Sequence, residues 1–153
     1  MAKQDKYTRE LATEEILLAK RDKGLTFDEI AEAIGRHPVW VASAIMGQAT
    51  MNAEEVYALV KLLDLNPSIT TVLQDFPMKG SLEDRIPVDP LLYRFHEILQ
   101  VYGTTMKAVI QEKFGDGIMS AIDFTMDIDK EEDPAGDRVV VTMNGKFLPY
   151  KKW

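Results

Sequence analysis

The sequence of 153 residues contains no cysteine and only two histidines, His37 and His96. The lack of cysteine excludes disulfides, thiolate metal sites and cysteine nucleophiles. No cluster of histidine and carboxylate residues stands at the spacing of metal ligands, so we expect no metal and no cofactor. The acidic run at 127–133 lacks the D-x-D-x-D-G pattern of a calcium loop and is expected to be a solvated strand end and turn.

Long apolar runs are also missing, and none approaches the roughly 20 residues that cross a bilayer. The first ten residues, MAKQDKYTRE, are charged and carry no apolar signal segment. Neither a phosphate-binding glycine-rich loop nor a GxSxG motif is present. The composition, 46% hydrophobic and 28% charged, is typical of a soluble globular protein. We therefore expect a cytoplasmic protein with no membrane partner.

The chain has no excess of positive charge, and its net charge is −7. Residues 1–75 carry −4 (8 basic, 12 acidic) and residues 76–153 carry −3 (10 basic, 13 acidic). An evenly acidic surface repels nucleic acid and anionic membranes. It also repels small anions, so any anion site has to be a sheltered exception built around particular cations.

Helix signals fill the first half of the chain, which we expect to be a helical domain over residues 1–76. Thr26 with Glu29, and Asn52 with Glu55, have the spacing of capping boxes. Apolar residues follow at helical spacing, and Pro38 is suited to the start of a helix, with His37 as its cap. The expected helices begin near residues 9, 26, 38, 52 and 66.

The segment LTFDEIAEAIGRHPVWVASAIMGQ resembles a repressor-type helix-turn-helix. A helix that reads DNA needs polar or basic side chains facing the bases. The second helix offers instead the apolar sequence VWVASAIM, with one hydroxyl. We therefore expect helix packing there, including packing against another subunit, and no nucleic-acid partner.

A connector rich in proline and glycine, QDFPMKGSLEDRIPV, leads to a second domain over residues 77–153. Asp89 and Pro90 begin a helix that we expect to end at Gly103, and a further helix is expected from Thr104 to Phe114. Alternation over 122–128 predicts a strand, the residues Asp-Pro-Ala-Gly at 133–136 predict a turn, and 138–142 is expected to be a second strand. The dipeptide at 144–145, Asn-Gly, is typical of a tight turn. A lone hairpin is marginally stable, so we expect it to pair with a second copy of the chain. The predicted fold class is α+β.

Three side chains in this half could form a small-anion site. Arg94 and Glu97 are three residues apart in a helix and share a face. A Gly-Asp-Gly turn at 115–117 then leads to Ser120. Taken alone, a surface ion pair and a turn serine without any function explain these residues more simply.

A resemblance over most of this half of the chain favours a functional role for these residues. The segments DRIP, YRF, QVYGTT, EKFGDGI, SAI and GKFLP stand where the cyanase (cyanate hydratase, cyanate lyase) family has them. The resemblance is weak over the first 75 residues and specific from Pro77 onward. The chain departs from the pattern only slightly, with Ser81 where some relatives carry cysteine and Asp123 where asparagine also occurs.

The resemblance implies that cyanate reacts with bicarbonate, as a co-substrate, to give carbamate and carbon dioxide, and that carbamate then yields ammonia. It assigns the catalytic roles to Arg94, Glu97 and Ser120. It also implies a homodecamer built as five interlocked dimers. Ile118 and Leu148 are candidate walls of the pocket, which we expect at a subunit interface. Two other hypotheses are a repressor-like DNA-binding protein with a dimerisation hairpin and a purely structural oligomer.

Overall fold

The computed structural model describes residues 7–80 and 85–153, which fall into two compact units, one within residues 1–81 and one within residues 82–153. The first is helical, and the second combines one helix with an antiparallel pair of strands. This confirms the α+β class. Ser81 and the connector residues 82–84 lie outside the described residues.

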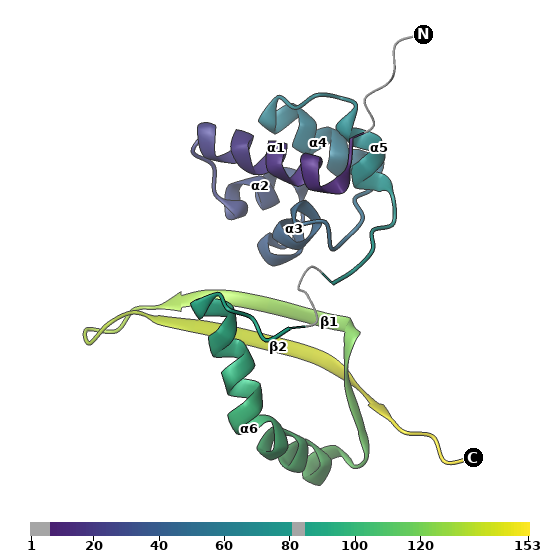
Figure 1. Ribbon diagram of the computed structural model, residues 1–153, viewed down its shortest axis with the longest axis vertical. Coiled ribbons are helices and arrows are strands. Elements are labelled where there is room, and N and C mark those ends of the chain that lie inside the picture. The colour runs from purple at the N-terminus through teal and green to yellow at the C-terminus, as the bar shows by residue number, and fades with distance from the viewer. Residues whose placement is uncertain (1–6, 81–84) are drawn as a thin grey trace. The chain divides into compact units, whose positions relative to one another are not determined.

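Five helices make up the N-terminal unit (Figure 1). Four of them begin within one residue of the predicted position, but the last begins at Ile69, about three residues later than expected, and its N-cap Ser68 makes no side-chain cap hydrogen bond. The helices are α1 (Arg9–Asp22), α2 (Phe27–Ile34), α3 (Pro38–Ile45), α4 (Ala53–Leu63) and α5 (Ile69–Gln74).

Both predicted capping boxes are present. The Thr26 hydroxyl accepts a hydrogen bond from the Glu29 amide, while the Glu29 carboxylate accepts one from the Thr26 amide at 2.7 Å. The amide and hydroxyl of Thr26 hold the pKa of the Glu29 carboxyl below its usual value, because they favour the charged form. Asn52 and Glu55 form the same reciprocal pair at α4. His37 caps α3 by accepting from the Val39 amide, as predicted.

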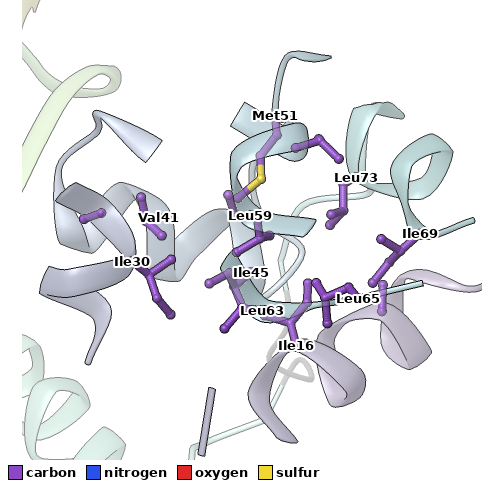
Figure 2. Close-up of a cluster of buried hydrophobic side chains, with 14 residues drawn as sticks. Ile16, Ile30, Val41, Ile45, Met51, Leu59, Leu63, Leu65, Ile69 and Leu73 are labelled. Carbon is purple, nitrogen blue, oxygen red and sulfur yellow. The ribbon is translucent and has the colours of Figure 1, made fainter. Parts of the chain in front are cut away.

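A single apolar core holds the unit together. Figure 2 shows its side chains meeting between the helices, with contributions from all five. Every fully buried large side chain of the described chain belongs to this cluster. Among its members are Ile16 of α1, Ile30 of α2, Ile45 of α3, Leu59 of α4 and Leu73 of α5.

The second helix of the helix-turn-helix segment takes part in this core. Val41, Ala44 and Ile45 of α3 are buried. The half-buried residues that α3 leaves outside the core include one hydroxyl and no basic group: Pro38, Val39, Trp40, Ala42 and Ser43.

The C-terminal unit begins with α6, a single helix from Pro90 to Phe114. Asp89 caps it, with its carboxylate accepting from the amides of Leu91 and Leu92. The predicted end at Gly103 is wrong, because the helix continues through that residue. One glycine inside a helix costs only about 1 kcal/mol relative to alanine, which the uninterrupted hydrogen-bond ladder outweighs.

Two long antiparallel strands follow, β1 (Gly117–Glu131) and β2 (Arg138–Pro149) (Figure 1). The predicted turn at Asn144–Gly145 is wrong, since β2 runs through both residues, which pair with Thr125 and Phe124. The turn predicted at residues 133–136 is confirmed, because the hairpin turns between Glu131 and Arg138, where Gly136 has φ +129°.

Within one chain the C-terminal unit has no apolar core. None of the residues of α6 is buried, and Ser120 is the one buried residue among those described in the unit. The helix exposes apolar side chains on several faces: Leu91, Leu92, Phe95, Ile98, Leu99, Val101, Tyr102, Met106, Val109 and Phe114. A surface of this kind marks an interaction site.

Among the described residues, no helix combines the length and the apolar character that crossing a membrane requires.

The buried carboxylate of Glu55 generates a stability prediction. It accepts a hydrogen bond from Arg36 Nε at 2.5 Å and one from the Asn52 amide at 2.8 Å. Replacing Glu55 with alanine removes both, so we expect the free energy of unfolding of the N-terminal unit to fall by about 1–2 kcal/mol. Urea unfolding followed by tryptophan fluorescence, to which Trp40 contributes, measures the loss. Glu54→Ala is the matched control, because this exposed neighbour lies in the same first turn. Equal stability of the two variants would contradict the prediction.

Candidate active site

Arg94 and Glu97 form an ion pair on α6. The Nη1 atom of Arg94 lies 3.3 Å from Oε2 of Glu97, and the two side chains are 61% and 49% exposed. The guanidinium also lies 5.4 Å from the centre of the Tyr93 ring. An exposed pair of this kind adds little to stability, and in this structure the guanidinium is turned toward the carboxylate.

Ser120 lies in a wide bulge of β1. Met119 pairs with Phe147 and Phe124 pairs with Gly145, so residues 120–123 of β1 stand opposite Lys146 alone. The residues of the bulge differ strongly in solvent exposure, since Ser120 is 5% exposed and Ile122 is 98% exposed. The serine is therefore drawn inward while its neighbour points to solvent.

The bulge also fixes what the serine hydroxyl can do. Its Oγ accepts hydrogen bonds from the amides of Ile122 at 3.1 Å and Asp123 at 3.0 Å. A hydroxyl has two acceptor positions and one proton to donate. With both acceptor positions used, its proton is left for another acceptor, and none receives it within the part of the chain that the structure describes. Ser120 is thus prepared as a hydrogen-bond donor.

Within one chain, the structure brings together two of the three predicted site residues. Arg94 and Glu97 are paired, while no hydrogen bond or ion pair among the described residues joins Ser120 to either. The helix is tied to the strands near its end, where Phe114 stacks on Phe147 with ring centres 5.1 Å apart. One chain therefore supplies the parts of the site without closing it.

The residues predicted as pocket walls lie beside the serine. Ile118 and Leu148 are direct cross-strand partners, and both side chains are exposed. His96 lies next to the ion pair on α6, with its ring centre 6.0 Å from that of Tyr93. Its Nε2 atom is buried and has no hydrogen-bond partner among the described residues.

A hollow among the described residues lies away from these side chains. A cavity of about 790 Å³ in the N-terminal unit is lined by the start of α1, the end of α3 and residues 75–78. Arg9 donates from Nη2 to the Asp75 carbonyl oxygen there at 2.7 Å, and burial lowers the pKa of its guanidinium. None of the three predicted site residues lines this cavity. Pocket size alone therefore gives no support to the site on α6 and β1.

Metal chemistry has no visible basis in the described residues. Across residues 7–80 and 85–153, no three or more histidine, aspartate or glutamate side chains gather as metal ligands would. The charged groups there are a guanidinium, which suits binding of a small anion, and the carboxylate that is paired with it.

Two family models match the sequence. The model described as the cyanate lyase C-terminal domain matches residues 84–152, which hold all three predicted site residues. The model described as cyanate hydratase, N-terminal, matches residues 9–77. Together the two matches cover nearly the whole chain.

Individual relatives agree with these matches. The chain is 62% identical to a cyanate hydratase of Synechococcus sp. (strain CC9311) over 141 residues, which is 92% of this chain and 94% of the relative. It is 60% identical to a cyanate hydratase of Parasynechococcus marenigrum (strain WH8102), again over 92% of this chain and over 96% of the relative. Among solved structures, the cyanase from T. urticae matches with a TM-score of 0.82 and 37% identity, covering 91% of this chain and 97% of that one.

Proposed function

Because the chain belongs to the cyanate hydratase (cyanate lyase) family, we propose that it decomposes cyanate in a bicarbonate-dependent reaction. The products of the first stage are carbamate and carbon dioxide, and carbamate then breaks down to ammonia and carbon dioxide. The reaction needs no cofactor, with bicarbonate as co-substrate. We also propose a cytoplasmic location, since a chain without cysteine needs no oxidising compartment to fold.

One observation carries this proposal on the structural side. An oriented guanidinium on α6 and a serine prepared as a donor on β1 are the groups that two small anions require. The assignment of Arg94, Glu97 and Ser120 as catalytic residues rests on this chemistry and on the family resemblance of the segments that contain them.

The physical obstacle is the repulsion between cyanate and bicarbonate. Two unit charges about 4 Å apart repel by roughly 1 kcal/mol in water and by several times more in a partly dry pocket. The planar guanidinium of Arg94 is a cation that can donate to carboxylate-like oxygens through two nitrogens at once. It offsets the repulsion and orients both reactants, and proximity then supplies much of the rate.

The proposed steps balance without an added nucleophile. A bicarbonate oxygen attacks the cyanate carbon, and the adduct loses carbon dioxide as its C–O bond to the former bicarbonate carbon breaks. The nitrogen gains two protons, one from bicarbonate and one from solvent, to give carbamate. Carbamate takes up one further proton and releases ammonia and carbon dioxide.

Ser120 and Glu97 have distinct tasks in this scheme. As attack bends the linear cyanate, negative charge develops on it, and the Ser120 hydroxyl donates a hydrogen bond to that charge. Glu97, whose Oε2 lies 3.3 Å from Nη1 of Arg94, has one of two roles: it holds Arg94 or Ser120 in position, or it also relays a proton.

We further propose that the enzyme is a homodecamer of five dimers and that the active site closes at a subunit interface. The exposed apolar surface of α6 supports this, because burial against another copy would give the C-terminal unit the interior that one chain lacks. The same burial would exclude water from Arg94 and bring arginines of neighbouring chains together.

The co-substrate role of bicarbonate can be tested directly. In a buffer freed of carbon dioxide, we expect ammonia release from cyanate to stop and to return when bicarbonate is added. Coupled detection of ammonia measures both conditions, and a chain carrying Arg94→Ala controls for spontaneous breakdown of cyanate. A full rate without bicarbonate would indicate simple hydrolysis instead.

The geometry of Arg94 leads to a second test. Arg94→Lys keeps the positive charge but loses the planar pair of donors, so we expect kcat/KM for cyanate to fall by at least about tenfold, or about 1.4 kcal/mol of transition-state stabilisation. Steady-state kinetics with each substrate varied in turn measure the loss. Lys107→Arg, an exposed cation further along α6, is a control for charge exchange on the same helix. Wild-type kinetics in Arg94→Lys would argue against a two-nitrogen clamp.

The assembly has a simple physical signature. Ten chains of 17.3 kDa give a mass of about 173 kDa, which multi-angle light scattering after gel filtration measures. We expect this mass to persist at micromolar chain concentration. A stable 17.3 kDa species that retains full activity would overturn the interface proposal.

A further inference from the structure

Gly145 stands opposite the bulge that holds Ser120. A Cβ atom added to Gly145 would lie 2.4 Å from the carbonyl oxygen of Ser120 and 2.5 Å from Cγ of Met119. Both distances are shorter than real Cβ contacts allow. The backbone of the bulge therefore occupies the space that any side chain at position 145 would need.

The backbone conformation of Gly145 does not itself require glycine. Gly145 is not among the glycines with positive φ, and it pairs with Phe124 as an ordinary strand residue. An alanine could adopt this conformation without strain. The requirement for glycine comes from the close approach of the two strands, which is a recognised use of glycine inside a strand.

The backbone of Gly145 approaches most closely the residue that is proposed to act in the reaction, Ser120. The atom in the way on the bulge is the main-chain oxygen of Ser120 itself, which a change of rotamer cannot move. Met119 Cγ, by contrast, belongs to a flexible side chain that can turn aside. A side chain at 145 would thus push the Ser120 backbone outward and disturb the two amide hydrogen bonds that orient its hydroxyl.

We propose that Gly145 is a positioning residue for the reaction, because its missing side chain lets β1 fold into the bulge that presents the Ser120 hydroxyl as a donor. This inference rests on the proposed role of Ser120 in cyanate decomposition. Gly145 does not touch the substrates and acts through Ser120 alone.

The test is a double-mutant cycle in the full-length chain, with ammonia release from cyanate and bicarbonate as the assay. Ser120→Ala is expected to lower kcat by about 10²–10³. Gly145→Ala is expected to lower kcat at least about tenfold while KM for either anion stays within about threefold, since the donor acts mainly in the transition state. In the Ser120→Ala background, Gly145→Ala should change kcat by less than about twofold, because the hydroxyl that it displaces is already gone.

Two further variants separate the backbone contact from its neighbours. Met119→Ala removes the flexible side chain near position 145 but leaves the Ser120 carbonyl oxygen where it is. If the clash with that oxygen causes the loss of kcat, the double variant Met119→Ala/Gly145→Ala should keep most of the loss. Gly103→Ala is the matched glycine control, because an added Cβ there meets nothing within 4 Å and φ is not positive. It should keep kcat within about twofold.

Each contrary result has its own meaning. Wild-type kcat in Ser120→Ala would remove the serine from the proposed mechanism. If Ser120→Ala does lower kcat, the inference about Gly145 is overturned when Gly145→Ala has a wild-type kcat, or when it lowers kcat equally with and without Ser120. It is also overturned when Met119→Ala fully restores the kcat of Gly145→Ala, or when Gly103→Ala lowers kcat as much as Gly145→Ala does. Failure of Gly145→Ala to reach the wild-type mass by light scattering would also overturn it, since the glycine would then shape the whole hairpin.

Discussion

The C-terminal unit has to bury an apolar surface for which one chain provides no interior. Its long helix carries apolar side chains on several faces and has no buried residue, whereas the N-terminal unit has a closed core fed by all five of its helices. The two-stranded hairpin does not replace the missing core, because such a pair of strands is marginally stable by itself. In the assembly proposed above, the unit that carries the candidate site residues would depend on association, and so would any shelter from water for a guanidinium that is exposed in one chain.

That dependence gives a reason for the division between the two units. An acidic surface repels small anions in bulk solution, so a site for them needs cations gathered in a place that solvent and acidic side chains do not reach. Arg94 lies on the helix with the exposed apolar surface, and Ser120 lies at the bulge of the strand that follows. Association that covers the helix would also enclose the guanidinium. The same association between chains would thus bury the apolar surface of the unit and shield the site from water.

Much of the local structure could be predicted from single residues. The capping boxes at Thr26 and Asn52, the cap at His37 and the helix start at Asp89 were confirmed, because a cap depends on neighbours within three residues. Two of the errors concern glycine. At Gly103 a helix was expected to end, but stopping needs a left-handed conformation that this glycine does not adopt. At Gly145 a turn was expected, although glycine within a strand pattern also signals a bulge or a close backbone approach.

By itself, the sequence determined the helix caps, the α+β class and the family, because these depend on residue types at short, fixed spacings. It also supplied Arg94, Glu97 and Ser120 as candidates, and the helical spacing of the first two predicted their contact. Only the tertiary structure decided that β1 bulges at Ser120, that two amides take up both acceptor positions of its hydroxyl, and that Gly145 leaves the room for it. These features arise where Ser120 and Gly145, which are 25 positions apart in the sequence, meet across the two strands. No local pattern records how closely the backbones of the strands approach.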